Sequence, residues 1–250
     1  DFRRASLLSV ARGATFLQIS KADINDLLIP LPPLDEQKRI AEILGGIADC
    51  ISAVQSEIDG IEALISSMIS CYSDGSEELA VLSGGLSLGA HRKSKPITAN
   101  YLRVANVFWG KISYDEIKEL KCTEKELERT LLQDGDILIT EAHANRLQVG
   151  RSAVVRDCPQ HLVFQNHLFR ARPLGIINSD VLAAMLGSTT VRRQLYQRAK
   201  TTSGLNTIAI SQVRSLDVPV PSKEEQAELH SCLRQLDKLR QLLHQKLTLL

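Results

Sequence analysis

Residues 31–70 read LPPLDEQKRIAEILGGIADCISAVQSEIDGIEALISSMIS, and this stretch organises the rest of the chain. Apolar residues follow one another in it at alternating steps of four and three, at Ile40, Leu44, Ile47, Ile51, Val54, Ile58, Ile61, Ile65 and Met68. Such a heptad pattern, sustained over four heptads, is typical of a helix that packs along another helix. The helix would be roughly 55 Å long at about 1.5 Å per residue. That length suits a spacer or a docking strut better than a piece of ordinary core.

Part of this stretch occurs again near the C-terminus, at a constant offset of 189 residues. The repeated positions are Pro30 and Pro219, Pro32 and Pro221, Glu36 and Glu225, Gln37 and Gln226, Ile40 and Leu229, Leu44 and Leu233, and Ile47 and Leu236. A repeat of this length is too long for a solenoid unit. It indicates two copies of a module in which a globular domain is followed by a long helix. The chain would contain the end of one copy and nearly all of the next.

Local patterns predict the elements of these modules. In the first 33 residues, a short strand is expected over 24–31. In the complete domain, strands are expected over 101–108, 137–140, 149–155, 163–171 and 213–220, and a helix of about 20 residues over 179–200. Thr123 and Glu126 form a capping box that opens a helix over 123–131, and Ser222 and Glu225 form another before the last helix. Residues 201–207 are expected to form a loop.

Composition limits the classes to which the chain can belong. Hydrophobic residues make up 44% and charged residues 24%, as in a folded globular protein. No run of 18 apolar residues and no signal-peptide pattern is present, so we expect no membrane partner. The five cysteines include no CxxC pair, which indicates reduced thiols in a cytoplasmic protein.

The distribution of charge is more informative than the net charge of +1. No acidic residue occurs between Glu78 and Asp115, or between Asp180 and Asp217. These two segments carry Arg92, Lys93, Lys95, Arg103, Lys111, Arg192, Arg193, Arg198, Lys200 and Arg214. Charge separated in this way favours a phosphate-binding face, although solvated helix and loop surface would give the same pattern.

The sequence carries none of the common catalytic motifs. The sequence contains no GxxxxGK[ST], GxGxxG, HExxH or GxSxG motif and no kinase signature. His143 and His167 are isolated, and Asp134 and Asp136 are better explained by a tight turn than by a metal site. We therefore expect no enzyme activity, no metal and no cofactor in this chain.

Polar residues of the types that read nucleic acids gather in four predicted loops. Bases are read by Arg, Lys, Asn, Gln, Ser and Thr, and phosphates are held by Lys, Arg and backbone amides. The clusters are Arg92, Lys93, Ser94 and Lys95; His143, Asn145, Arg146 and Gln148; Gln165, Asn166 and His167; and Lys200, Thr201, Ser203 and Asn206. Each cluster alone could be an ordinary polar loop. Together they predict a DNA-binding face on one domain.

In several short motifs the chain resembles the specificity subunits of type I restriction–modification systems. The resemblance rests on YLRVANV (101–107), GDILI (135–139), VGR (149–151), QNHLFRARP (165–173), TSGLNTI (202–208) and the repeated Pro-x-Pro…Glu-Gln that leads into a long helix. It covers nearly the whole chain, and the order of the motifs is more specific than any one of them.

The resemblance implies an α+β fold. Residues 1–33 would be the end of a first target recognition domain and 34–72 the central conserved helix. Residues 73–221 would be a complete recognition domain with a mixed or antiparallel sheet, and 222–250 the distal conserved helix. The two helices would pack as an antiparallel coiled coil.

The resemblance also implies partners. The chain would read one half of a split site in double-stranded DNA, and its helices would dock methyltransferase subunits, which supply catalysis. A motor-nuclease subunit would then join. With one complete recognition domain, the chain is either a fragment or a half-length form that pairs with a second copy of itself. Two alternatives stay open: the recognition part of a single-chain restriction–modification enzyme, and a coiled-coil protein-interaction module.

Overall fold

The structure is a computed structural model that describes residues 18–25, 31–70, 72, 74–75, 78–202 and 204–249. The chain divides into two compact units, one ending at Ser52 and one spanning Ala53–Leu249. In the first unit Lys21–Asn25 forms a short helix, α2. The strand expected over 24–31 is therefore wrong at its start, and residues 26–30 lie outside the described part. Ser20 and Asp23 explain the helix, because each side chain accepts a hydrogen bond from the backbone amide of the other.

The long helix is present as α3 (Leu34–Ile69). Asp35 and Glu36 lie in its first turn, where carboxylates are favoured by the helix dipole. Burial along its seam changes partway. In the first unit Ile40, Leu44 and Ile51 are exposed, whereas in the second unit Val54, Ile58 and Ile61 are buried. The heptad pattern thus predicts the helix correctly, but only its C-terminal part is covered.

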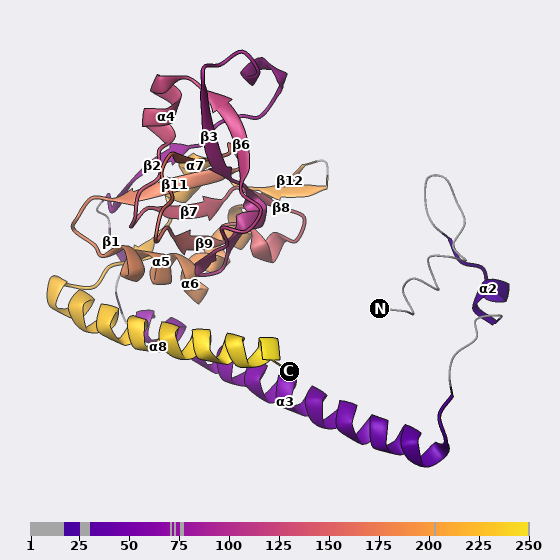
Figure 1. The fold of residues 1–250 in the computed structure, drawn as a ribbon. Coiled ribbons are helices and arrows are strands. Elements are labelled where there is room, and N and C mark those ends of the chain that lie inside the picture. The colour runs from indigo at the N-terminus through magenta and orange to yellow at the C-terminus, as the bar shows by residue number, and fades with distance from the viewer. Residues whose placement is uncertain are drawn as a thin grey trace. The chain divides into compact units, whose positions relative to one another are not determined.

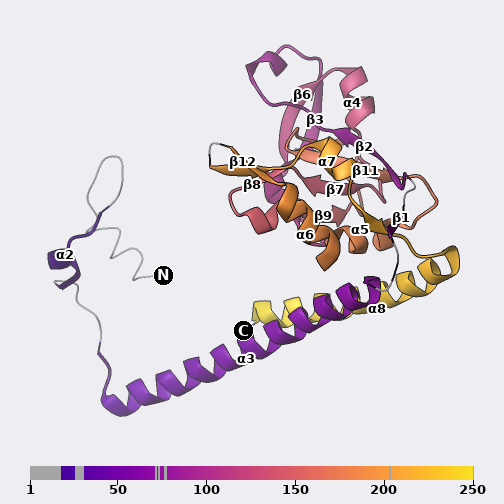
Figure 2. The ribbon, with the colours of Figure 1, turned by 180° about the vertical axis from the view of Figure 1, so that it is seen from behind.

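The cover for that part is α8 (Lys223–Leu249), which runs antiparallel to α3 (Figure 1, Figure 2). Val54, Ile58 and Ile61 pack against Leu243, with Ile65, Leu236 and Leu247 around them. The capping box predicted before this helix is confirmed. Ser222 donates its amide to Glu225 Oε2 at 2.7 Å, and Glu225 donates its amide to Ser222 Oγ at 3.3 Å.

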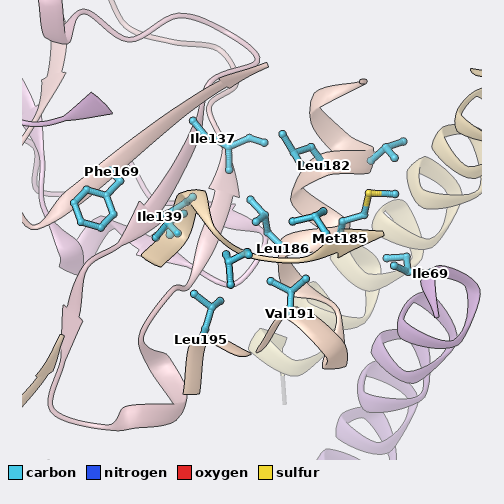
Figure 3. Packing of buried hydrophobic residues seen from close by; sticks show 14 of the residues in the cluster. Ile69, Ile137, Ile139, Phe169, Leu182, Met185, Leu186, Val191 and Leu195 are labelled. Atoms are coloured by element: carbon cyan, nitrogen blue, oxygen red, sulfur yellow. The ribbon is translucent and has the colours of Figure 1, made fainter. Parts of the chain in front are cut away.

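A four-stranded antiparallel sheet forms the centre of the globular body, in the order β2 (Ala80–Gly84), β11 (Leu168–Pro173), β7 (Ile137–Thr140), β9 (Ser152–Val154). Helices α5 (Ser179–Gly187) and α6 (Thr189–Arg198) lie between this sheet and α8 (Figure 1). Ile137 and Ile139 of β7 pack on Leu182, Met185 and their neighbours in the main core (Figure 3). Leu138 points into a second core with Phe164 and Leu168. Burial on both faces explains the unbroken apolar run of β7.

A second sheet has the order β10 (Leu162–Phe164), β3 (Ile97–Leu102), β6 (Lys118–Cys122), and its β10–β3 pair is parallel. Strand β6 is followed in the chain by α4 (Glu124–Thr130), which begins at the predicted capping box of Thr123 and Glu126. A third sheet has the order β12 (Lys200–Thr202), β13 (Leu205–Thr207), β8 (Ala142–His143). The mixed and antiparallel sheets with two long helices confirm the expected α+β class.

The remaining elements are short. Strand pairs form between β4 (Val107–Phe108) and β5 (Lys111–Ile112) and between β1 (Asp74–Gly75) and β14 (Val218–Pro219). The 3₁₀ turns are η1 (Ala90–Arg92), η2 (Val104–Asn106) and η3 (Arg146–Gln148), and α7 spans Ile210–Arg214. No helix in the described part of the chain is long and apolar enough to cross a membrane.

Several predicted elements differ from the structure. The helix over 179–200 is broken at Ser188, whose side chain accepts a hydrogen bond from Val191 N and caps α6. The strand over 163–171 is two strands in different sheets, and the strand over 101–108 gives way to η2 after Leu102. The strand over 213–220 is the end of α7 followed by β14. The loop over 201–207 is the β12–β13 hairpin, because neighbouring strand β8 supplies pairing partners that its polar sequence does not reveal.

Candidate nucleic-acid interface

The third sheet brings two of the predicted polar clusters together. Asn206 of β13 lies opposite His143 of β8 in the antiparallel register. The Asn206 carboxamide is buried, donates to Ala144 O at 2.9 Å and accepts from Thr201 Oγ1 at 2.8 Å. It fastens the hairpin to the segment that follows β8. Residues 62 positions apart in sequence thus form one edge of the body.

The segment after β8 is held by its own polar side chains. Arg146 Nη2 donates to Ala199 O at 2.7 Å, and its guanidinium lies 4.6 Å from the centre of the Tyr196 ring. Asn145 Oδ1 accepts from Leu147 N at 3.0 Å and caps η3. The loop is therefore anchored to α6 rather than free.

The Gln165–His167 turn lies beside this edge. His167 Nδ1 is 2.9 Å from Glu141 Oε2, and Glu141 immediately precedes β8. Gln165 is buried and pairs through its backbone with Leu86. A Cβ on Gly85 would lie 2.3 Å from Gln165 O, so only glycine allows this approach.

The first cluster is largely committed to internal contacts. Arg92 is only 5% exposed; it donates to Ser87 O, donates to Lys121 O at 3.1 Å and pairs with Glu126 at 3.4 Å. Lys95 Nζ lies 2.6 Å from Glu126 Oε1. The hydrogen bond from Lys95, with those from Thr123 and the charge of Arg92, lowers the pKa of Glu126 to about 2. These contacts stabilise the corner between β6 and α4.

The predicted contact residues therefore fall into groups. Arg92, Lys95, Arg146, Gln165 and Asn206 make internal contacts, and His143, Gln148 and Asn166 are half-buried. Lys93, Ser94, Asn145, His167 and Lys200 are exposed. Ser203 lies outside the described residues. A contact of any of them with DNA stays a prediction.

Some cations have no internal partner. Among the described residues, the cationic side chains that are exposed and make no hydrogen bond or ion pair include those of Lys93, Arg193, Lys200 and Arg214. Arg193 and Arg214 belong to the acid-free segment between Asp180 and Asp217, whose charge favours a phosphate-binding face, but they are outside the four polar clusters. In the part of the chain that the structure covers, no three His, Cys, Asp or Glu side chains gather as metal ligands.

The known proteins to which the chain is similar include several specificity subunits of type I restriction enzymes. The family model for the type I restriction modification DNA specificity domain matches residues 3–63. The type I restriction enzyme EcoKI specificity subunit of Escherichia coli (strain K12) is 27% identical over 93% of this chain and 55% of the relative. The StySPI specificity subunit of Salmonella potsdam is 23% identical over 94% of this chain and 56% of the relative. The chain thus spans about half the length of these curated relatives.

Solved structures share the fold. A chain from a type I restriction–modification system, described for its complex assembly and conformational transition, superposes with a TM-score of 0.55 at 17% identity. That match covers 99% of this chain and 64% of the other. The HsdS subunit of Thermoanaerobacter tengcongensis gives a TM-score of 0.50 at 17% identity, covering 97% of this chain and 61% of the other.

Proposed function

We propose that this chain, which is related along nearly its whole length to the specificity subunits of type I restriction–modification systems, is a sequence-reading DNA-binding subunit of such a system. The observation that carries the proposal is that the similarity runs through the globular body as well as the helices. On this proposal the chain has no catalytic step and no cofactor of its own, and other subunits perform the chemistry.

The charge of the body supports DNA as the ligand. The charged groups of four exposed cations have no hydrogen bond or ion pair within the described residues; these cations are Lys93, Arg193, Lys200 and Arg214. Phosphate contacts supply affinity and register, whereas sequence is read by side chains that reach base edges. Within the predicted set, the exposed candidates for base reading include Ser94, Asn145 and His167.

The internal repeat supports a second recognition body in the assembly. Gln37 Nε2 donates to Pro32 O at 2.7 Å, and Gln226 Nε2 donates to Pro221 O at 3.2 Å, so the repeated positions make the same contact. Gln226 also donates to Ile176 O and accepts from Asn178 N, which seats α8 on the body. We infer that Gln37 and the apolar residues after it seat another body in the same way, for which a second copy of this chain is a candidate.

The helix pair supports docking of other subunits. Leu239, Leu242 and Leu249 of α8 and Leu64 of α3 are exposed although they lie on helices whose other faces are packed. Exposed apolar stripes of this kind mark interaction surfaces. We propose that methyltransferase subunits bind there, with a motor-nuclease subunit joining the assembly afterwards.

Selection of duplexes from a random DNA pool, with the methyltransferase partner present, tests the proposal. On the selected duplex, Lys93→Ala and Lys200→Ala should each lower the slope of log K against log salt by about 0.9. Lys125→Ala, at an exposed lysine that stands between Glu124 and Glu128 in α4, is the control and should leave the slope unchanged.

Failure to select any duplex, even at low salt, would favour a coiled-coil interaction module instead. A methyltransferase or nuclease motif encoded on the same polypeptide would favour the recognition part of a single-chain enzyme.

A further inference from the structure

The β12–β13 hairpin presents two different faces. Its register pairs Lys200 with Thr207 and Thr201 with Asn206, so Lys200, Leu205 and Thr207 share one face, and Thr201 and Asn206 share the other. The hairpin lies at the edge of the body and extends outward beside β8 (Figure 1, Figure 2).

One of these faces is committed to the body. Asn206 is buried, and its carboxamide donates to the backbone oxygens of His143 and Ala144. Because side chains alternate along a strand, fixing Asn206 inward turns Leu205 outward.

The outward face carries an apolar side chain beside a cation. Leu205 is 47% exposed and belongs to none of the hydrophobic clusters in the described residues. The side chain of Lys200 is exposed and makes no hydrogen bond or ion pair in the same part of the chain. A single exposed leucine is ordinary. Here the arrangement is more specific. The hydrogen bonds of Asn206 fix the hairpin so that Leu205 points outward, on the same face as the unpaired side chain of Lys200.

Strand β8 pairs with Asn206 and Thr207 only, so at Leu205 the hairpin is a two-stranded ribbon. A ribbon of two strands fits the major groove of B-DNA, which is about 12 Å wide. In that groove thymine presents a methyl group, and an apolar side chain contacts it favourably. We propose that the β12–β13 hairpin enters the major groove, that Leu205 contacts the 5-methyl group of a thymine, and that Lys200 holds a neighbouring phosphate. This inference rests on the proposed DNA-reading function and assigns a specificity-determining residue to it.

The test compares thymine with deoxyuridine, which lacks only the methyl group. Each thymine of the selected duplex is replaced in turn by deoxyuridine, and binding of the full chain is measured with the methyltransferase partner present. At one thymine the wild-type chain should lose about fourfold in affinity, the effect expected for about one buried methyl group. Leu205→Ala should bind the two duplexes equally and keep its affinity for random DNA. Leu205→Met should retain the preference.

Leu174→Ala is the matched control, because Leu174 is also 47% exposed and lies in the loop after β11. It should keep the wild-type preference. If Leu205→Ala discriminates as the wild type does, or if no thymine of the selected duplex is sensitive to loss of its methyl group, the inference is wrong although duplex selection has succeeded. Failure to select any duplex would overturn the proposed function itself, so the two failures are distinguishable.

Discussion

Ile58 and Ile51 occupy the same heptad position of α3, seven residues apart, yet Ile58 is 3% exposed and Ile51 is 40% exposed. Replacing Ile58 with alanine removes side-chain carbon atoms from the cluster that α3 forms with Leu243 of α8. Burial is worth about 0.8 kcal/mol per methylene, and the cavity left behind adds to the loss. We expect Ile58→Ala to lower the free energy of unfolding by about 2–4 kcal/mol.

Ile51→Ala is the control, because the residue types and the helix are the same and the change in helix propensity therefore cancels. Its larger exposure should limit the loss to about 1 kcal/mol or less. Urea unfolding followed by circular dichroism at 222 nm gives both values, provided that the slope of free energy against urea is unchanged between variants.

Equal losses for the two variants would refute the reasoning, because they would mean that exposure in the isolated chain does not determine the contribution of the seam. Measurements at several protein concentrations would show whether two copies of the chain associate. If two copies associate through the first part of α3, the loss for Ile51→Ala should grow with protein concentration, whereas the loss for Ile58→Ala should not depend on it.

Three further predictions concern the body. The hydrogen bond from Lys95 lowers the pKa of Glu126 from 4.5 to about 2. The ionised carboxylate therefore stabilises the fold above pH 4.5, and this contribution is lost as the pH falls towards 2. In Glu126→Gln, the free energy of unfolding should depend less on pH between 4.5 and 2. Asn206→Ala leaves two carbonyl groups without its amide and should cost about 1–3 kcal/mol, seen as faster hydrogen exchange in β13. Asp136 is buried and accepts two hydrogen bonds of 2.7 Å from Arg172, so Asp136→Asn should lower the unfolding free energy by about 3 kcal/mol in urea titration.

Features with a local cause could be predicted from the sequence. The heptads gave both long helices, because a 3.5-residue period does not fit a strand. The capping boxes at Thr123 and Ser222 marked helix starts, because the bonding partners lie three residues apart in the chain. The apolar run over 137–140 predicts a buried strand, and the structure has β7 there with every residue buried.

Features decided by distant partners could not be predicted. The polar sequence around Asn206 gives no strand pattern, and only pairing with β8 makes it a hairpin. Arg92 and Gln165 are candidates by residue type, because arginine and glutamine side chains can read bases. The same side chains also satisfy buried backbone carbonyls and carboxylates, and the structure uses Arg92 in that way. Residue type alone does not separate these two uses.

The apolar surface exposed on the first part of α3 is small, and this limits how strongly it alone could hold a partner. Three seam residues, Ile40, Leu44 and Ile51, and the neighbouring Ile43 are each about half exposed. Covering all four completely would contribute roughly 1 kcal/mol per residue, or about 4 kcal/mol together. Association itself costs about 4–15 kcal/mol in lost rigid-body freedom. The apolar stripe alone would therefore not hold a partner, and a covering body must add polar contacts. The α8 end of the repeat provides the pattern for them, because Gln226 exchanges hydrogen bonds with Ile176 O and Asn178 N of the body. On the two-body proposal Gln37 makes the equivalent bonds, so Gln37→Ala should weaken the assembly even though it removes no apolar contact.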